Sequence, residues 1–406
     1  MKSLSPLILA TLIASKKLKP LQRYDTIQVV GGEDDKFPTP EVIFDLTGMV
    51  RRYFALDALG FDSGKNIICS PLSALLPLGK LALGTEKGKS RDELLNAIGS
   101  TRFNVQGDTK ELMNTISDVS GVAMTVISRI FVSTTLKLSK EYLKTTRQLY
   151  GSSVQRLDFT KSIESIKHVN DWVNNQTRGM IQNILKVQDI TPSTSILLVN
   201  AVYFLGYWKY PFDVPFVGSF YSPRGVKNTL LMKTRNHFSY YQSGALDAQI
   251  IVIPYKSEKA SFVIVLPLSK TGLPNLITAL RSNPDLLNIE MAKMTPQFIE
   301  VTMPKFKITT ELNLKLLLQK IGVTKIFTKE SGLVKIAERP LSVSYGVQRA
   351  VIDVTEKGTE GSASTVIYMQ QVSLLDHTTK FIADRPFLFY VKVAGEQLFA
   401  GIFNNN

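Results

Sequence analysis

The run at residues 196–204 constrains the fold more than any other part of the chain. Its sequence, ILLVNAVYF, is almost entirely apolar, is rich in β-branched residues, and is bounded by Pro192 and Gly206. A short continuous apolar run of this kind is typical of a central strand that is buried on both faces. The sequence therefore predicts a large sheet with this run near its centre.

The other predicted elements are helices early in the chain and strands later. Apolar residues at three- and four-residue spacing follow the cap Thr39 and predict a helix from Pro40 to about Gly60. Further helices are expected at 73–83, 91–98, 163–185 and 312–321. Strands are expected at 250–254, 261–266, 299–303, 342–355 and 387–403. Because helices and strands do not alternate as βαβ units, the pattern indicates an α+β fold.

Length and composition favour one large domain. A chain of 406 residues usually divides into two or three domains, but no linker, repeat or low-complexity tract interrupts residues 38–406. A hydrophobic content of 44% is too high for a disordered chain. The net charge of +14 comes from Lys and Arg residues that are spread out with few aromatic residues among them. This predicts a solvated basic surface and no nucleic-acid binding.

Residues that could carry catalysis are scarce. Cys69 is the single cysteine, so an intrachain disulfide and a cysteine-based zinc site are excluded, and its apolar neighbours predict a buried thiol. Neither HExxH nor GxSxG occurs, and the three histidines are far apart. The segment 84–90 is one residue short of a phosphate-binding loop and follows a helix, so it predicts a polar turn. We expect no catalytic site, metal or cofactor, although spacing alone leaves a pair of catalytic carboxylates open.

The N-terminus has the order of residues found in signal peptides. Lys2 precedes an apolar stretch at 4–13, and the small residues Ala14 and Ser15 follow it. Residues 1–15 are therefore predicted to be a signal peptide of a secreted, extracellular protein, and the alternative is a disordered leader. Residues 16–37 show no sustained periodicity and are expected to form an extension. No later stretch has the roughly 18 apolar residues of a membrane-spanning helix.

A long segment between two predicted strands has the residue pattern of a strand. Within residues 356–377, one set of alternating side chains is small or apolar: Thr359, Gly361, Ala363, Thr365, Ile367 and Met369. The other set begins with polar residues: Glu360, Ser362, Ser364, Val366, Tyr368 and Gln370. This period of two is typical of a strand with one buried face. A loop with such a pattern is able to insert into a sheet.

Seven short motifs, in order, resemble those of the serpins, a family of protease inhibitors. They are NIICSPLS at 66–73, NDWV with TRGMI at 170–181, LVNAVYFLGYW with Phe212 at 198–212, PYK at 254–256, LP at 266–267, PKF at 304–306 and DRPFLF at 384–389. The resemblance extends from about Pro38 to Phe403. It implies three sheets, about eight or nine helices, and an exposed reactive-centre loop at about 356–380.

The resemblance also implies a mechanism. A target serine or cysteine protease attacks a carbonyl of the loop and forms an acyl-enzyme, and the cleaved loop then inserts as a new central strand of the main sheet. The insertion drags the protease along and distorts its active site. This requires a metastable starting fold, and the inhibitor is consumed in the reaction.

The hinge of the loop decides whether a serpin inhibits. Glu356 and Gly358 match the hinge pattern of the family, and Thr359 is a favoured first inserting residue. The positions that follow are Glu360, Gly361, Ser362, Ala363 and Ser364. No proline, charge or bulky side chain lies on the inserting face from 359 to 365, which favours an inhibitor over a non-inhibitory carrier or extracellular signalling protein.

Two residues depart from the family pattern. Gly361 stands where the family prefers alanine, and Gln348 replaces the usual histidine of the region where the sheet opens. The resemblance assigns five residues to that region: Ser70, Ser73, Asn200, Trp208 and Gln348. Because an amide and an imidazole bond differently, the replacement is expected to alter the hydrogen bonds of Gln348 with Ser70, Ser73 and Asn200.

The length of the loop predicts the scissile bond. The 28 positions from Gly358 to Pro386 match antithrombin-like serpins and place the bond at Val372–Ser373. A small aliphatic residue suits an elastase-like protease, and the absence of Lys and Arg from 359 to 379 argues against a trypsin-like one. Cleavage after Tyr368 or Met369 by a chymotrypsin-like protease is the alternative.

Accessory features complete the sequence-based predictions. Asn175 lies in a glycosylation sequon, Asn175-Gln176-Thr177. The positive charge is compatible with a heparin-like glycosaminoglycan as a partner, although Lys and Arg are not concentrated at 103–120, where antithrombin-like members bind heparin. We expect a monomer.

Overall fold

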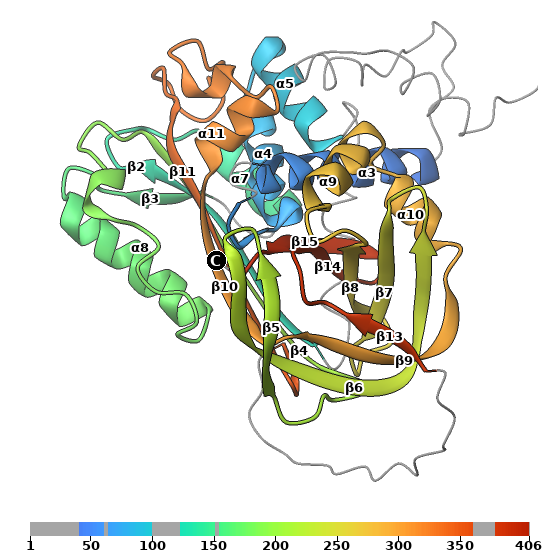
Figure 1. Ribbon diagram of the computed structural model, residues 1–406. Coiled ribbons are helices and arrows are strands. Elements are labelled where there is room, and N and C mark those ends of the chain that lie inside the picture. Colours follow the sequence, from blue (N-terminus) through green and yellow to red (C-terminus); the bar gives the residue numbers. More distant parts are fainter. Residues whose placement is uncertain (1–39, 61–63, 100–121, 151–153, 360–377, 406) are drawn as a thin grey trace, which may run out of the picture.

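The computed structural model describes residues 40–60, 64–99, 122–150, 154–359 and 378–405 (Figure 1). Two sheets with helices packed around them form the fold. The six-stranded sheet contains, in spatial order, β10 (Phe306–Asn313), β11 (Val343–Thr355), β12 (Gly358–Thr359), β4 (Ile196–Tyr207), β2 (Val122–Ser133) and β3 (Gln155–Leu157). Every residue of β4 from Ile196 to Phe204 is buried, which confirms the predicted central strand.

The two faces of β4 pack against different layers. Leu197, Val199 and Ala201 lie in one hydrophobic cluster with Val169 and Val173 of α8 (Ser162–Gln176). The residues between them, such as Leu198 and Val202, belong to clusters on the other side of the sheet. In Figure 1, α8 accordingly lies on one side of the six-stranded sheet, opposite the other elements. The period of two along β4 thus fixes both layers.

The nine-stranded sheet is held together by one long strand, β6 (Gly225–Ser243). Residues 225–240 of β6 pair with β5 (Phe216–Ser222) and β9 (Thr295–Pro304), and residues 239–243 pair with β7 (Ala248–Pro254). The remaining strands are β8 (Ala260–Pro267), β14 (Phe387–Val393), β15 (Glu396–Phe403), β1 (Ile67–Cys69) and β13 (Thr379–Ile382). One group of strands, β5, β9 and β13, is joined through β6 to the other group, β7, β8, β14, β15 and β1. The structure therefore has two hydrogen-bonded sheets where three were expected.

Eight α-helices lie in the described part of the chain, in agreement with the expected α+β class. Besides α8 they are α3 (Pro40–Leu59), α4 (Pro71–Leu83), α5 (Lys89–Ile98), α7 (Lys140–Tyr150), α9 (Leu273–Ser282), α10 (Leu286–Met291) and α11 (Leu314–Lys320). Residues 84–88 join α4 to α5 as a turn, whereas Lys89 and Ser90 of the predicted turn already belong to α5. None of the helices described is long and apolar enough to cross a bilayer.

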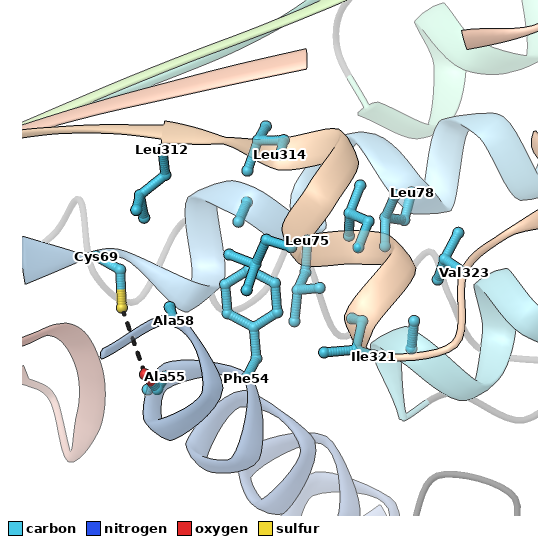
Figure 2. Close-up of a cluster of buried hydrophobic side chains, with 14 of the residues drawn as sticks. Phe54, Ala55, Ala58, Cys69, Leu75, Leu78, Leu312, Leu314, Ile321 and Val323 are labelled. Atoms are coloured by element: carbon cyan, nitrogen blue, oxygen red, sulfur yellow. Dashed lines mark hydrogen bonds between the residues drawn. The ribbon is translucent and has the colours of Figure 1, made fainter. Parts of the chain in front are cut away.

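Cys69 is buried in the core between α3, α4 and α11 (Figure 2). Its thiol lies 3.9 Å from the carbonyl oxygen of Ala55. Burial raises the pKa of this thiol to about 12, so the reactive thiolate is suppressed. The prediction of a structural cysteine is confirmed.

Three predicted boundaries are wrong for identifiable local reasons. The helix expected at 163–185 ends at Gln176, because Arg178 and Gly179 adopt positive φ angles of 52° and 86°. The helix expected at 312–321 begins at Leu314, because the two preceding residues belong to β10. The strand expected at 387–403 is a hairpin that turns at 394–395, where both residues have positive φ.

Candidate functional site

The predicted hinge already lies inside the six-stranded sheet. Thr359 pairs with Val354 of β11 and with Gly206 of β4, so β12 sits between these strands and is antiparallel to both. Further along, β11 and β4 pair directly with each other in parallel, from Val343–Ile196 to Val351–Tyr203. The sheet is therefore closed over most of its length and parted at one end by β12, which consists of the hinge residue Gly358 and the predicted first inserting residue Thr359.

Thr359 is held there by a buried hydrogen bond. Its side chain is fully buried, and its Oγ1 lies 2.8 Å from the hydroxyl of Tyr255. Burial raises the pKa of Tyr255 above its ordinary value, so this phenol stays neutral and pairs with the neutral threonine hydroxyl. The pairing satisfies both polar groups inside an otherwise apolar site.

Gly358 is the residue that allows the chain to enter the sheet. It has a φ of 153°, and a Cβ atom at this position would lie 2.1 Å from the carbonyl oxygen of Gly206 and 2.6 Å from the Cα of Tyr207. No side chain fits in that space without movement of the β4 backbone. The side-chain hydroxyl of Thr355 donates to the Gly358 carbonyl over 2.8 Å and closes the turn between β11 and β12.

Trp208 anchors the turn that precedes the hinge. Its indole stacks on Tyr255 with ring centroids 4.6 Å apart, and its Nε1 donates to the carbonyl of Thr355 over 2.8 Å. Its backbone N–H donates to the carbonyl of Lys357 over 3.0 Å. An indole buried among aromatic rings with its N–H satisfied is a rigid support for the neighbouring backbone.

Glu356 links the same turn to Lys305, which lies between β9 and β10. Its carboxylate accepts a hydrogen bond from Lys305 Nζ over 2.8 Å. Partial burial alone would raise the pKa of Glu356. The hydrogen bond from Lys305, a backbone hydrogen bond and the positive charges of Lys305 and Lys357 together outweigh burial and hold the pKa below its ordinary value. The hinge is thus fixed at Glu356, Gly358 and Thr359.

Gln348 ties the N-terminus of α4 to the middle of the six-stranded sheet. Its Nε2 donates to the carbonyl of Ser70 over 2.9 Å, and its Oε1 accepts from the N–H of the same residue over 3.0 Å. The Ser70 side chain caps α4 by accepting from the N–H of Ser73 over 3.4 Å. Gln348 therefore bonds both backbone polar groups of Ser70.

Asn200 lies next to Gln348 in the strand register but is not bonded to it. Both polar atoms of the Asn200 amide are buried without a hydrogen-bond partner in the described structure, and the same holds for the hydroxyl of Ser73. Each buried polar group left unpaired costs about 1–3 kcal/mol. The closed sheet is therefore less stable here than a fully bonded sheet would be.

The structure divides the five residues that the sequence assigned to the opening region. Ser70, Ser73, Asn200 and Gln348 gather in one cluster, whereas Trp208 lies beside the hinge. Asn200 and Trp208 are eight residues apart along one extended stretch, which corresponds to roughly 26 Å. No role was predicted for Tyr255 or Lys305, although they lie in the sequence motifs PYK and PKF.

Of the other predicted site residues, the structure describes Asn175 and leaves those of the loop outside the described ranges. Glu360, Gly361, Ser362, Ala363, Ser364, Val372 and Ser373 lie outside the described residues. Asn175 is exposed at the end of α8, and the hydroxyl of Thr177 donates to the Val173 carbonyl over 2.8 Å. Within the described ranges, no three His, Cys, Asp or Glu side chains gather as metal ligands.

Comparisons with known proteins agree with this geometry. The family model described as Serpin (serine protease inhibitor) matches residues 55–406. Antichymotrypsin-2 of Bombyx mori is 33% identical over 356 residues, which cover 84% of this chain and 92% of the relative.

Two solved structures share the fold over nearly all of the chain. The crystal structure of Serpin48, described as a highly specific serpin of the insect Tenebrio molitor, superposes with a TM-score of 0.82 at 28% identity and covers 91% of this chain and 100% of that one. The structure of native protease nexin-1 with heparin gives a TM-score of 0.80 at 25% identity, with coverage of 90% and 100%.

Proposed function

This chain belongs to the serpin family, and on that premise we propose that it is a suicide-substrate inhibitor of serine endopeptidases. The observation that carries the proposal is the placement of β12. A glycine without room for a Cβ atom and a buried threonine already occupy the gap between β11 and β4. The residues that follow in the sequence have small side chains on the inserting face, so the strand can continue in the same direction.

The trapping step starts with ordinary acyl transfer. The serine hydroxyl of the protease attacks the carbonyl carbon of Val372 and forms an ester, while the bond to Ser373 breaks and its amine leaves with a proton. The chain N-terminal to the cut is then free to extend β12 down the sheet. The ester would move with it, away from the entrance of the sheet.

The sheet pairing supplies a reason for insertion to be favourable. Insertion would replace one parallel pairing, β4 with β11, by two antiparallel pairings with the new strand between them. Antiparallel ladders are slightly more stable per residue than parallel ones, and the number of inter-strand hydrogen bonds rises. The partly unsatisfied cluster at Asn200 and Ser73 lies on the path of the new strand, where the existing pairing must open.

The proposed target is an elastase-like protease, with a chymotrypsin-like protease as the second choice. The argument is the side chain of Val372, together with the lack of basic residues from 359 to 379. A relative named antichymotrypsin is consistent with this range of targets. A secreted monomer, removal of residues 1–15 and a glycan on Asn175 complete the proposal.

Incubation with pancreatic elastase and with chymotrypsin, followed by a denaturing gel, tests the proposal. We expect a covalent complex that survives boiling in detergent. Clean cleavage of the loop with full protease activity remaining would instead indicate the non-inhibitory carrier or signalling protein. Thr359→Arg should turn the inhibitor into a substrate, because a charged side chain cannot enter this buried position, whereas Lys357→Arg should leave inhibition unchanged.

A further inference from the structure

The hairpin of β5 and the first part of β6 has an outer face that is apolar at both ends. Successive residues of a strand point to opposite faces, and residues directly opposite each other on paired strands share a face. On the other face, Phe220 and Leu231 are buried. Three cross-strand pairs form the outer face: Val217 with Leu230, Ser219 with Asn228, and Tyr221 with Val226.

Exposed apolar side chains are concentrated in this hairpin. Thirteen large apolar side chains are exposed in the described part of the chain, and five of them lie between residues 214 and 231. Single exposed apolar residues are normal, but a cluster of them indicates a surface that another molecule covers. We name this cluster the apolar hairpin, and it comprises Val214 (86% exposed), Phe216 (42%), Val217 (68%), Val226 (63%) and Leu230 (49%).

The charges around the apolar hairpin are mainly positive. Residues 214–246 include no Asp or Glu but four basic residues: Arg224, Lys227, Lys233 and Arg235. Glu300 pairs with the last two of these. Arg224 and Lys227 form no ion pair with any residue that the structure describes. Lys270 adds a third cation, because its Nζ lies 3.1 Å from the centroid of the Tyr221 ring.

Two acidic residues adjoin the apolar hairpin without cancelling this charge. Asp213 directly precedes it. Asp384 is in contact with it through the backbone, where its carbonyl accepts from the N–H of Tyr221 over 2.7 Å, but its carboxylate pairs with Arg385. A positive excess therefore remains beside the exposed apolar side chains.

This combination of side chains fits a lipid surface. Aliphatic side chains enter the boundary between headgroups and acyl chains, a tyrosine is favoured at that boundary, and neighbouring Lys and Arg side chains attract anionic headgroups. A second copy of the chain is a poorer partner, since a symmetric contact would bring Arg224, Lys227 and Lys270 of both copies together. We propose that the apolar hairpin binds membranes that contain anionic lipids.

The fold leaves the apolar hairpin open to such a surface. β5 pairs with β6 and with no other strand of the described structure, and none of the helices drawn in Figure 1 crosses the hairpin. Its base lies beside the hinge, because the N–H of Phe212 donates to the carbonyl of Glu356 over 2.8 Å. A bound membrane would hold the inhibitor at the lipid surface. That consequence rests on the proposed function, whereas the binding itself does not.

Sedimentation of the full chain with vesicles that contain phosphatidylserine tests the apolar part of the proposal. Val217→Ser/Leu230→Ser removes one cross-strand pair. Val187→Ser/Leu316→Ser is the matched control, because these side chains have similar exposed fractions of 70% and 53%. We expect the hairpin variant to bind about tenfold more weakly or worse, and the control to bind like the unchanged protein. Circular dichroism verifies that both variants fold.

A second pair of variants tests the charged part. Arg224→Gln/Lys227→Gln should weaken binding to phosphatidylserine vesicles by about tenfold or more and reduce its dependence on salt. Lys144→Gln/Arg147→Gln, on α7, loses the same charge from another exposed surface and should have little effect. Vesicles of phosphatidylcholine alone should bind the unchanged protein weakly.

A local fluorescence measurement does not depend on removing any contact. Val226→Trp places an indole on the outer face of the apolar hairpin, and Val187→Trp places one at a distant exposed position. With phosphatidylserine vesicles, emission from the first variant should shift to shorter wavelength and be quenched by brominated lipids. The second variant should show neither change.

Several outcomes would overturn the proposal. The unchanged protein failing to sediment with phosphatidylserine vesicles would refute it, and so would equal losses in the hairpin variants and their controls. Self-association of the unchanged protein that Val217→Ser/Leu230→Ser abolishes, without vesicle binding, would assign the face to a second copy. Slower trapping of the protease by this variant in the absence of lipid, again without vesicle binding, would assign it to the protease. Because vesicle binding is measured without protease, a failure of inhibition leaves the membrane result intact.

Discussion

Tyr255→Phe isolates the hydrogen bond that holds the hinge inside the sheet. The substitution keeps the ring that stacks on Trp208 and removes only the hydroxyl, which leaves Thr359 Oγ1 buried without its partner. An unpaired buried hydroxyl costs about 1–3 kcal/mol, and every 1.4 kcal/mol is a factor of ten. The equilibrium between docked and released hinge should shift toward release by about 5- to 150-fold.

Tryptophan emission reports this shift. The chain contains two tryptophans, and Trp172 lies on α8, where Arg129 stacks on its ring at 4.2 Å. In a Trp172→Phe background, emission comes from Trp208, whose indole N–H bonds the turn before the hinge. We expect altered emission and faster inhibition of the protease, because a released hinge lengthens the loop that the protease must engage. Tyr240→Phe, which removes a hydroxyl bonded to Gln249, is the matched control.

A double-mutant cycle measures the coupling between the hydroxyls of Tyr255 and Thr359. Thr359→Val removes the other hydroxyl, and the pair Tyr255→Phe/Thr359→Val should cost less than the sum of the single changes, because no buried hydroxyl is then left alone. Strictly additive effects, or a Tyr255→Phe variant with unchanged emission and inhibition rate, would refute a docked hinge that depends on this bond.

Three further predictions concern other contacts of the site. Gly358→Ala should release the hinge more completely than Tyr255→Phe, because the added Cβ meets the β4 backbone at 2.1 Å; unchanged Trp208 emission would contradict this. Gln348→Leu should lower the melting temperature, at a cost of roughly 1–3 kcal/mol for each backbone group of Ser70 left unpaired, whereas the exposed Gln242→Leu should not. The folded-state pKa of Glu356 lies below its ordinary value of 4.5, so its bond to Lys305 stabilises the fold above that pH and is lost as the pH falls further. Lys305→Met should therefore reduce stability at pH 7 and flatten the acid limb of a melting-temperature profile; an unchanged acid limb would count against this pair.

The sequence predicted the parts of the fold that depend on local pattern. The β-branched run at 196–204 became the central strand, and the apolar periodicity after Pro40 placed α3, which ends at Leu59, correctly. Turns made by side chains were missed: Asn170 bonds both backbone groups of Leu185, at 2.9 and 3.1 Å, and so replaces the last helical turns expected there. Such a contact is not visible as a period in the sequence.

In the candidate site, too, local patterns were predictable from the sequence and long-range contacts were not. The alternation after Glu356 predicts a segment able to insert, but the position of Thr359 depends on β4 and Tyr255, which are more than a hundred residues away. The two-way bond of Gln348 to Ser70 likewise joins residues 278 positions apart. Long-range partners of this kind follow from the topology of the sheet rather than from local pattern.

The mass of the denatured protein–protease complex tests the central claim most directly. If the chain traps its target as an acyl-enzyme at Val372, intact-mass spectrometry after incubation with elastase will show the protease joined to this chain without residues 373–406, which are released as a separate peptide. Free protease at its original mass, together with both cleavage fragments and no joined species, would contradict the account.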